Sequence, residues 1–382
     1  MQIKISHESV IPLHEQLHNQ LRQSILSGRW PPGYRLPSET ELQRQLKISR
    51  STIRQALRSA EVEGLIERVP GRGTFVAQPH TRHNGRSPIA FVTFDFESEF
   101  QRLLLTGAEM AARHAGYPII FANSSGDMQE ERRLLERLKQ DRVAGILLWS
   151  ILEYSSPGYW LERLQNGFPP VTLMDRTLKG LQCDFVASDN YAGAYAATRH
   201  LLELGHQQIV FLSCRILGLL PIAERLRGYR AALEDAGLAP NEPWLVGEAH
   251  QELLHRAALL AYGDPASPHV QQIVAYLETE RPTAIFTMND NLALLALKAA
   301  RLAGLSVPDD VSIVGFDDMD VVSHLEIPLT TVAQDTYQIG KRAAELLIER
   351  IEGYDGPPRW ELLPTQLKVR ASTAMASLAE AR

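Results

Sequence analysis

The sequence predicts a multidomain protein in which a small N-terminal α+β domain precedes a larger, two-lobed α/β domain built on parallel sheets. The chain has 382 residues, more than one domain usually holds. Helical stripes and a short hairpin occupy residues 1–77, whereas apolar runs alternate with helical stretches from residue 89 onward. Residues 1–88 carry 13 basic and 7 acidic side chains, and the remainder carries 26 and 38. The N-terminal part is therefore the one that we expect to meet a polyanion.

Composition excludes several classes of protein. Hydrophobic residues make up 45% of the chain and charged residues 22%, which is typical of globular domains and not of disordered chains. The two cysteines, Cys183 and Cys214, form neither a disulfide framework nor a paired-cysteine metal site. The first residues are not a signal peptide, and no apolar run approaches the ~18 residues that span a bilayer. We expect a cytoplasmic protein without metal or cofactor.

Three helices are expected in the N-terminal domain. An apolar residue recurs at every fourth position over 13–25, which predicts one amphipathic helix. Ser38 and Glu41 have the spacing of a capping box, which predicts a second helix over 38–46. Ser49 can cap a third helix that follows after a tight turn. Two helices joined in this way form a helix-turn-helix.

The third helix has two different faces. Its inward face holds Ile53, Leu57 and Ala60. Its other face holds Arg50, Ser51, Thr52, Arg54, Gln55 and Arg58, with the three arginines spaced by four. Guanidinium groups and hydroxyls can bind phosphates and base edges, as a recognition helix in the major groove of DNA requires. For an isolated helix, a merely solvated polar face would be the more common interpretation.

The residues after this helix favour the DNA-binding interpretation. Residues 65–69 and 74–77 are typical of two short strands, and the turn 70–73 between them places Arg72 between glycines. Such a basic wing lets the backbone and Arg72 approach a sugar-phosphate chain closely. A helix-turn-helix followed by a basic wing predicts a winged helix that binds DNA.

Residues 10–77 resemble the winged-helix domain of the GntR family. The matching stretches include Gly33–Glu39, Ile48–Leu57, Glu63–Ile66 and Gly71–Val76. Carried over by position, the family's DNA contacts imply Ser38, Thr40, Arg50, Ser51, Thr52, Arg54, Arg72 and Gly73. Many relatives have Arg where this chain has Thr40, so that contact is altered here. Glu39 is expected to be structural or to orient a nearby Arg rather than to read bases.

Residues 78–87 have the composition of a linker, because they are polar, contain Pro and Gly and show no periodicity. We therefore place the DNA-binding domain at 1–77 and an effector-binding and dimerisation domain at 88–382. The strands expected in the second domain are Ile89–Phe94, Pro118–Ala122, Gly145–Trp149, Val171–Met174, Phe185–Ser188, Ile209–Leu212, Thr283–Thr287 and Ser312–Phe316. The helices expected between them include Leu103–Ala115, Glu130–Asp141, Ala192–Leu204 and Leu292–Ala303. This alternation predicts parallel sheets in two lobes.

Polar residues gather where these strands end, which is where such sheets bind ligands. They are Asp95, Trp149, Ser150, Asp175, Arg176, Asp189, Ser213, Asn289, Asp290, Asp317 and Asp318. Carboxylates, amides and arginines together suit a neutral polyhydroxylated molecule, because each sugar hydroxyl both donates and accepts hydrogen bonds. Each strand-end Asp or Ser can equally be a cap of the following helix, a role that Ser150 and Asp290 fit well.

Residues 88–370 resemble the effector domain of the LacI family, which shares its fold with periplasmic sugar-binding proteins. The matching stretches include Asp175–Arg176, Asp189–Gly193, His200–His206, Arg225–Tyr229, Val307–Asp318 and Pro328–Val332. The resemblance implies Phe100 as a stacking ring, and as hydrogen-bonding residues Ser150, Arg176, Asp189, Arg225, Asn289, Asp317 and Gln334. Asp95 is added because of its place at a strand end. Relatives often have two adjacent aromatic residues where this chain has Phe100 and Gln101.

The combined interpretation is a sugar-responsive transcription factor that acts as a repressor. A GntR-type domain in place of the LacI-type one resembles the arabinose-responsive repressors. We expect a homodimer on a palindromic operator, because two DNA-binding domains make twice as many contacts with DNA as one. The alternatives are an enzyme with an aminotransferase-like body and a sugar-transport binding module. The strand ends contain neither a lysine for pyridoxal phosphate nor a nucleophile elbow, which disfavours an enzyme.

Overall fold

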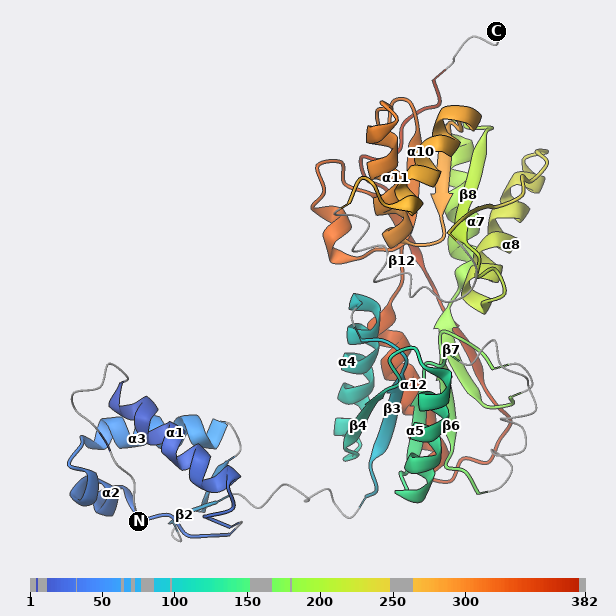
Figure 1. Cartoon of the computed structure of the whole chain (residues 1–382). Helices are drawn as coiled ribbons and strands as arrows, with labels where there is room; N and C mark the ends of the chain where they lie inside the picture. Colours follow the sequence, from blue (N-terminus) through green and yellow to red (C-terminus); the bar gives the residue numbers. More distant parts are fainter. Residues whose placement is uncertain are drawn as a thin grey trace. The chain divides into compact units, whose positions relative to one another are not determined.

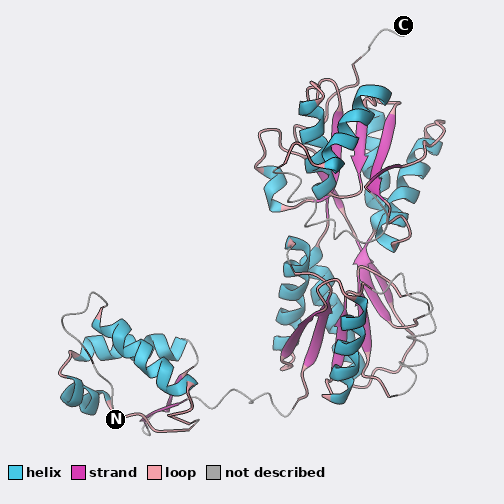
Figure 2. Ribbon diagram, viewed as in Figure 1, coloured by secondary structure: helices cyan, strands magenta, loops and turns pink. Residues whose placement is uncertain are grey.

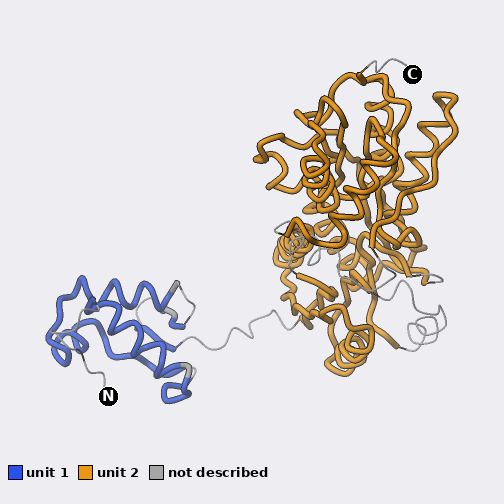
Figure 3. The backbone as a smooth tube through the Cα atoms, turned by 45° about the horizontal axis from the view of Figure 1, so that its top comes forward, with its two compact units in different colours: residues 1–85 blue, residues 86–382 orange. Residues whose placement is uncertain are grey.

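The computed structural model describes residues 5, 12–31, 33–62, 65–69, 73–76, 86–96, 98–151, 167–178, 181–247 and 264–377. The chain divides into two compact units, Met1–Gly85 and Arg86–Arg382 (Figure 3).

The described residues of the first unit form three helices and a hairpin (Figure 1). Its elements are α1 (Leu13–Leu26), α2 (Glu39–Leu46), α3 (Arg50–Val62), β1 (Ile66–Val69) and β2 (Gly73–Val76). The apolar stripe of α1 packs on the inward face of α3, and the core contains the fully buried Leu17, Leu21, Leu42, Ile53 and Leu57. Strands β1 and β2 pair antiparallel, with Ile66 opposite Val76. The predicted helices and the predicted hairpin are confirmed.

Local hydrogen bonds explain where α2 and α3 begin. The Ser38 hydroxyl accepts from the Glu41 amide at 3.3 Å, and the Glu41 carboxylate accepts from the Ser38 amide at 2.8 Å. This reciprocal pair is the predicted capping box. The Ser49 hydroxyl accepts from the Thr52 amide at 3.1 Å and so caps α3. Between the helices Lys47 adopts a left-handed conformation, φ 55°, which turns the chain sharply.

The second unit contains two sheets, each flanked by helices (Figure 2). The sheet of the first lobe has the strand order β13-β7-β6-β5-β3-β4, and all its strands are parallel. Its strands are β3 (Ile89–Thr93), β4 (Ile119–Asn123), β5 (Gly145–Leu148), β6 (Val171–Met174), β7 (Asp184–Ser188) and β13 (Trp360–Leu363). Helices α4 (Glu99–His114) and α12 (Thr336–Ile351) share one core with this sheet, and α5 (Met128–Gln140) packs in a second core.

The sheet of the second lobe has the order β14-β12-β11-β10-β8-β9, with only β14 antiparallel to its neighbour. Its strands are β8 (Ile209–Cys214), β9 (Trp244–Val246), β10 (Ala284–Thr287), β11 (Ser312–Asp317), β12 (Thr330–Ala333) and β14 (Gln366–Lys368). Its helices are α7 (Asn190–Glu203), α8 (Leu220–Asp235), α10 (Pro268–Glu280), α11 (Asp290–Leu302) and the short 3-10 helix η2 (Asp320–Ser323).

The chain crosses between the lobes at three places, after β7, after β12 and after β13. The carboxyl ends of the parallel strands in both lobes therefore face the same region, as the strand-end argument requires. In the first lobe, α4 and α12 approach each other at their backbones. A Cβ at Gly107 would lie 2.0 Å from the Tyr337 carbonyl oxygen, and one at Gly340 would lie 2.0 Å from that of Leu104. Glycine is required at both positions because of this close approach.

Candidate functional site

The first candidate site is the polar face of α3 in the N-terminal unit. Arg54 Nε donates to Glu39 Oε2 at 2.9 Å, and Arg50 Nε donates to Gln43 Oε1 at 2.9 Å. Both arginines are exposed, and both are oriented by side chains of α2. Glu39 thus orients an arginine, as predicted. These bonds leave the terminal guanidinium nitrogens available for phosphates or base edges, which is what reading a DNA groove requires.

The other predicted contacts of this unit lie around the start of α3. The Ser49 hydroxyl lies 2.7 Å from the hydroxyl of Ser51 and 2.7 Å from the hydroxyl of Thr52. Thr40 is exposed on the first turn of α2, whereas the Ser38 hydroxyl is engaged in the capping box. Gly73 is exposed at the start of β2, and Arg72 lies outside the described residues.

Arg35, which was not among the predicted DNA contacts, lies beside Gly73 of the hairpin. The segment before α2 adds to the hairpin, because the Leu36 amide donates to Thr74 O at 2.8 Å and the Val76 amide donates to Tyr34 O at 2.8 Å. This pairing places the Arg35 guanidinium beside Gly73, where a Cβ would come within 3.2 Å of Nε. The pairing joins residues far apart in the sequence, so no local pattern could have revealed it.

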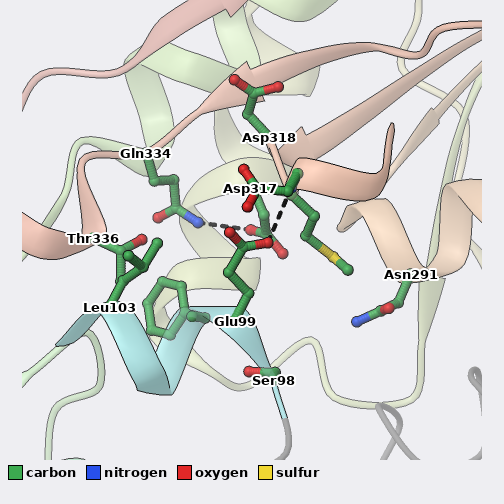
Figure 4. Close-up of a pocket in the computed structure, with 11 residues that line it drawn as sticks. Ser98, Glu99, Leu103, Asn291, Asp317, Asp318, Gln334 and Thr336 are labelled. Carbon is green, nitrogen blue, oxygen red and sulfur yellow. Dashed lines mark hydrogen bonds between the residues drawn. The ribbon is translucent and has the colours of Figure 1, made fainter. Parts of the chain in front are cut away.

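The second candidate site is a pocket between the two lobes of the second unit (Figure 4). It encloses about 530 Å³ without protein atoms, counted out to its open mouth. The start of α4, the start of α11, the end of β11 and the connection from β12 to α12 surround it. The lining residues are Ser98, Glu99, Phe100, Leu103, Asn291, Asp317, Asp318, Met319, Asp320, Gln334 and Thr336. Of the predicted effector contacts, Phe100, Asp317 and Gln334 line this pocket.

A chain of polar contacts leads from the pocket into the second lobe. Gln334 Nε2 donates to Asp317 Oδ1 at 2.6 Å, and the same oxygen lies 3.6 Å from Arg225 Nη2. Arg225 Nε donates to Asn190 Oδ1 at 2.8 Å, and its guanidinium lies 3.7 Å from the centre of the Phe316 ring. The Arg225 side chain is only 5% exposed, so this cation is held in place by its partners.

Burial shifts the pKa values of the two charged residues in this series of contacts. Burial raises the pKa of Asp317, although the positive charge of Arg225 opposes the effect. Burial lowers the pKa of Arg225, which the carboxylates of Asp317 and Asp175 oppose. The left-handed backbone of Asp317, φ 124°, is unusual for a residue other than glycine. Strained backbone and shifted pKa values cluster at binding sites.

An aromatic wall lies at the strand ends of the first lobe. The rings of Phe94 and Trp149 are 4.2 Å apart, and the Arg176 guanidinium lies over both, at 4.5 and 5.0 Å. Trp149 Nε1 donates to the buried Asp175 Oδ2 at 3.2 Å, and the Phe100 ring lies 5.6 Å from Trp149. Trp149 and Asp175 are among the strand-end residues identified in the sequence but were not predicted as effector contacts, because a position at a strand end does not show which residues bind a ligand.

The remaining nominated residues are engaged in local bonds. Asp189 caps α7 by accepting from the Ala192 amide, and Asn289 caps α11 by accepting from the Leu292 amide. The Ser150 hydroxyl donates to the buried Glu131 of α5. Asp95 accepts from the Phe96 amide at 2.6 Å and lies 3.4 Å from Gln101 Nε2. These residues surround the region between the lobes, but the structure does not bring them into the pocket lining.

Several buried polar atoms near the strand ends have no hydrogen-bond partner in the described part of the chain. They are Ser98 Oγ, Gln101 Oε1, Asp175 Oδ1, Arg176 Nε, Ser188 Oγ and Gln334 Oε1. Buried polar groups are usually satisfied by protein or by a bound molecule. No group of His, Cys, Asp and Glu side chains able to hold a metal ion occurs within the described ranges. No helix among these residues is long and apolar enough to cross a membrane.

Comparisons with known proteins give a family match for each unit. Residues 13–76 match the model for bacterial regulatory proteins of the gntR family, and residues 198–373 match that for a periplasmic binding protein-like domain. The chain is 32% identical over 351 residues to the arabinose metabolism transcriptional repressor of Geobacillus stearothermophilus, covering 90% of this chain and 93% of that protein. It is 31% identical to the transcriptional repressor PurR of Aliivibrio fischeri, over 74% of this chain and 79% of that protein.

Solved structures agree with these matches. A LacI family regulator from Enterococcus faecium with bound ribose superposes with a TM-score of 0.63 at 26% identity, covering 75% of this chain and 99% of that one. The first unit therefore provides a DNA-binding head, and the second provides a two-lobed effector domain. The chain belongs to the family of transcriptional regulators that join a GntR-type DNA-binding domain to a LacI-type, periplasmic-binding-protein-like domain.

Proposed function

We propose that this protein is a transcriptional repressor whose affinity for operator DNA is controlled by a small sugar-like molecule bound between the lobes of its second unit. The observation that carries the proposal is the presence, in one chain, of an exposed arginine face on α3 and a pocket that contains carboxylate and amide side chains, with an aromatic wall nearby. The relatives support it, because one is named for arabinose metabolism and another structure holds ribose.

The pocket suits a sugar chemically. Asp317 and Gln334 can accept hydrogen bonds from sugar hydroxyls, each of which can donate as well as accept. The Phe100 ring can cover the apolar face of a pyranose or furanose ring. We extend the site to Arg176 and the other predicted strand-end residues, and add Asp175; closure of the lobes around a ligand would bring these residues nearer.

The sugar acts by favouring one arrangement of the two lobes. A ligand shifts such an equilibrium only by its differential affinity for the two arrangements, and couplings of ~1–3 kcal/mol are typical. We propose that the sugar favours the arrangement with low affinity for DNA, so that its binding releases the operator. The linker 78–87 transmits the change to the DNA-binding domain.

We propose that the protein works as a homodimer on a palindromic operator in the cytoplasm. One winged helix contacts few base pairs, and a two-fold pair doubles them. An apolar patch on the second unit supports pairing: Ile120 and Phe121 on the edge strand β4 are 40% and 41% exposed, and Phe96 beside them is 39% exposed. Phe121→Glu is expected to shift the protein from dimer to monomer in sedimentation velocity.

We propose no catalytic activity. The relatives are transcription regulators. No lysine for pyridoxal phosphate stands among the described residues that line the pocket. The alternative of a sugar-transport module accounts for the second unit but leaves the DNA-binding unit without a role.

The test combines two measurements on the full chain. L-arabinose, D-ribose, D-xylose and D-glucose are screened by thermal shift, since a bound ligand raises the melting temperature by mass action. An operator fragment selected from random DNA is then titrated with and without the stabilising sugar. We expect one sugar to stabilise the protein and to weaken operator binding. Stabilisation by no sugar, or operator affinity that ignores the sugar, would contradict the proposal.

A further inference from the structure

Arg86, with which the second unit begins, is held by two side chains of the first lobe. Its Nη1 donates to Glu352 Oε1 at 2.6 Å, and its guanidinium lies 4.5 Å from the centre of the Tyr117 ring. Arg86 and Glu352 are exposed, whereas Tyr117 is buried in the core that α4 and α12 share. The end of the linker is therefore anchored to the body of the second unit.

The two side chains that hold Arg86 come from the ends of two helices. Glu352 is the C-cap of α12, and Tyr117 follows two residues after Ala115, the C-cap of α4. The Tyr117 amide donates to Ala112 O of α4 at 2.8 Å, which fixes Tyr117 to the end of this helix. A carboxylate at a helix C-terminus is unfavourable in the field of the helix dipole, and a cation beside it offsets this effect. Arg86 supplies that cation.

The opposite ends of the same two helices line the pocket. Glu99, Phe100 and Leu103 line it from the start of α4, and Thr336 is the first residue of α12. Each helix has 16 residues and is therefore about 24 Å long. The two helices thus extend through the first lobe from the pocket to Arg86.

The starts of both helices are connected to the second lobe. Glu99 Oε2 accepts a hydrogen bond from the Asp320 amide at 2.9 Å, which joins α4 to η2. Helix α12 follows β12 where the chain crosses between the lobes, and Gln334 in this connection bonds Asp317 of β11. A change in the arrangement of the lobes therefore acts on the starts of α4 and α12.

The two helices are also packed so closely that they move as one body (Figure 1). A Cβ at Gly107 or at Gly340 would lie 2.0 Å from a backbone oxygen of the other helix. Ala108 and Ala343 are fully buried in the core that surrounds this contact. Close-packed interiors have low compressibility and transmit strain, so a displacement of one helix displaces the other. Rigid secondary elements of this kind can carry coupling between distant sites.

Resting on the proposed function, we propose that the contact of Arg86 with Glu352 and Tyr117 is the junction through which α4 and α12 pass the effect of the sugar to the linker. Arg86 is a positioning residue, since it does not line the pocket. A sugar that changes the arrangement of the lobes shifts the paired helices, and their far ends carry the end of the linker with them. Without the junction, the linker no longer follows the helices, and the DNA-binding unit responds less to the sugar.

The experiment measures the coupling between pocket and operator in the full chain. Operator affinity is determined by fluorescence anisotropy without sugar and with saturating L-arabinose, D-ribose, D-xylose or D-glucose. The ratio of the two affinities is the coupling factor, which is typically about 5–150 for an allosteric pair. We expect Arg86→Ala to lower this factor at least about threefold, while the sugar affinity of the DNA-free protein, measured by isothermal titration calorimetry, stays within about twofold of the wild type.

Two further variants test whether Arg86 and Glu352 act through one contact. Glu352→Ala removes the ion pair from the side of α12 and should lower the coupling factor by a similar amount. The protein with both substitutions should lose no more than either single variant, because residues that share a contact are not additive. An unchanged factor in both single variants, or losses that add in the double variant, would overturn the inference and leave the sugar response intact. A wild type whose operator affinity ignores all four sugars would overturn both proposals.

Arg227→Ala is the matched control, because Arg227 makes the same two kinds of contact in the second lobe. Its Nη2 lies 2.6 Å from Glu224 Oε2, and its guanidinium lies 4.7 Å from the centre of the Tyr191 ring. Loss of exposed contacts of this type has little effect on stability, so both arginine variants should fold. The coupling factor of Arg227→Ala should equal that of the wild type. A fall as large as that of Arg86→Ala would show a general effect of losing such a contact and would overturn the inference.

Discussion

Glu39 of α2 holds Arg54 of α3 through a hydrogen bond of 2.9 Å from Arg54 Nε to Glu39 Oε2. The Arg54 side chain is 66% exposed, so the pair stabilises the fold by only ~0–1 kcal/mol. Its effect is on orientation, because a guanidinium fixed through Nε presents its outer edge in a defined direction. Glu39, at the start of α2, therefore fixes the direction of a cation on α3.

Replacing Arg54 with Ala is expected to weaken operator binding by ~1–3 kcal/mol with little change in melting temperature, because a base contact is lost from an exposed side chain. Fluorescence anisotropy with a selected operator measures the loss. Arg137→Ala, on the exposed surface of α5 in the second unit, is the control. Unchanged affinity of the Arg54 variant would remove it from the DNA contacts.

Glu39→Gln removes the charge of the residue that pairs with Arg54 and keeps an oxygen that can accept from Arg54 Nε. This variant loses the ion pair while Arg54 keeps its charge, so we expect a loss of affinity smaller than that of Arg54→Ala, together with weaker discrimination between operator and random DNA. Competition titrations with both DNAs measure the ratio. A Glu39→Gln protein with unaltered discrimination would show that the charge of Glu39 does not matter for reading.

Operator affinity is expected to fall steeply with salt concentration. Each phosphate contact releases counterions, with a slope of about −0.9 in log K against log salt per contact. Arg50→Ala should reduce the slope by about one if Arg50 binds a phosphate, since its Nη groups are not used by Gln43. Anisotropy titrations between low and moderate salt provide the slope. A flat response would contradict the arginine face as the contact surface.

Asp317→Asn is expected to abolish the sugar response and to spare operator binding by the N-terminal unit. Loss of the carboxylate leaves the buried Arg225 without its ion-pair partner, so the second unit should also become less stable. Gln334→Ala removes the hydrogen bond from Gln334 to Asp317 but leaves Asp317 as the partner of Arg225. This variant should therefore weaken sugar binding at a smaller cost to stability. Calorimetric titration and thermal unfolding report the two effects. A normal sugar response in both variants would place the sugar elsewhere.

Asp184 predicts a pH dependence of stability. It is fully buried at the start of β7 and bonds Arg350 Nε at 2.9 Å and Arg359 Nη2 at 3.0 Å. Burial alone would raise its pKa, but the bonds from Arg350 and Arg359 outweigh burial and lower the pKa from 3.8 to about 2. The stabilisation, about 2 kcal/mol, is therefore complete above pH 3.8 and is lost as pH falls toward 2.

Urea unfolding of the wild type and Asp184→Asn between pH 6 and pH 2.5 tests this prediction. Asp184→Asn leaves two cations facing a neutral amide, so it should be less stable than the wild type at pH 6. The gap between the two proteins should narrow as the pH falls, because the wild type loses its ionised partner. A gap that stays constant down to pH 2.5 would contradict the role of the ionised carboxylate.

The contact between α4 and α12 makes Gly107 intolerant of a side chain. Gly107→Ala places a Cβ 2.0 Å from the backbone oxygen of Tyr337, which forces the helices apart and should cost ~1–3 kcal/mol. Gly218→Ala is the control, since nothing lies within 4 Å of its added Cβ. Differential scanning calorimetry compares the two. Equal stability of both variants would contradict the tight helix contact.

Elements with strong local patterns were predicted from the sequence. All eight expected strands and four expected helices of the second unit are present within a few residues of their predicted ends. Strands β9, β12, β13 and β14 were not predicted. They are 3 or 4 residues long, and three of them, β9, β13 and β14, lie at the edges of their sheets. Edge strands such as Trp360–Leu363 have a mixed exposed and half-buried pattern that sequence periodicity does not distinguish from a loop.

The residues of the candidate sites were likewise predictable from the sequence only in part. Glu39 as a partner for an arginine could be inferred locally, because it lies in the first turn of a capped helix next to the recognition helix. Arg35 beside Gly73, and Asp320 beside Glu99, could not be inferred, because each pair joins segments that meet only after folding. The sequence also did not show that the side chains of Asp189 and Asn289 cap helices, whereas that of Asp317 lies beside Arg225.

By itself the sequence determined the helices, the principal strands, the basic wing and the two families of domain, since periodicity, capping and turn chemistry act over a few residues. Only the tertiary structure decided which strand-end side chains share a pocket and which are bound to their own helices. It also decided that the cations near the pocket are paired and that its lining is acidic. The physical reason is that burial and ion pairing depend on distances through space, which spacing along the chain does not encode.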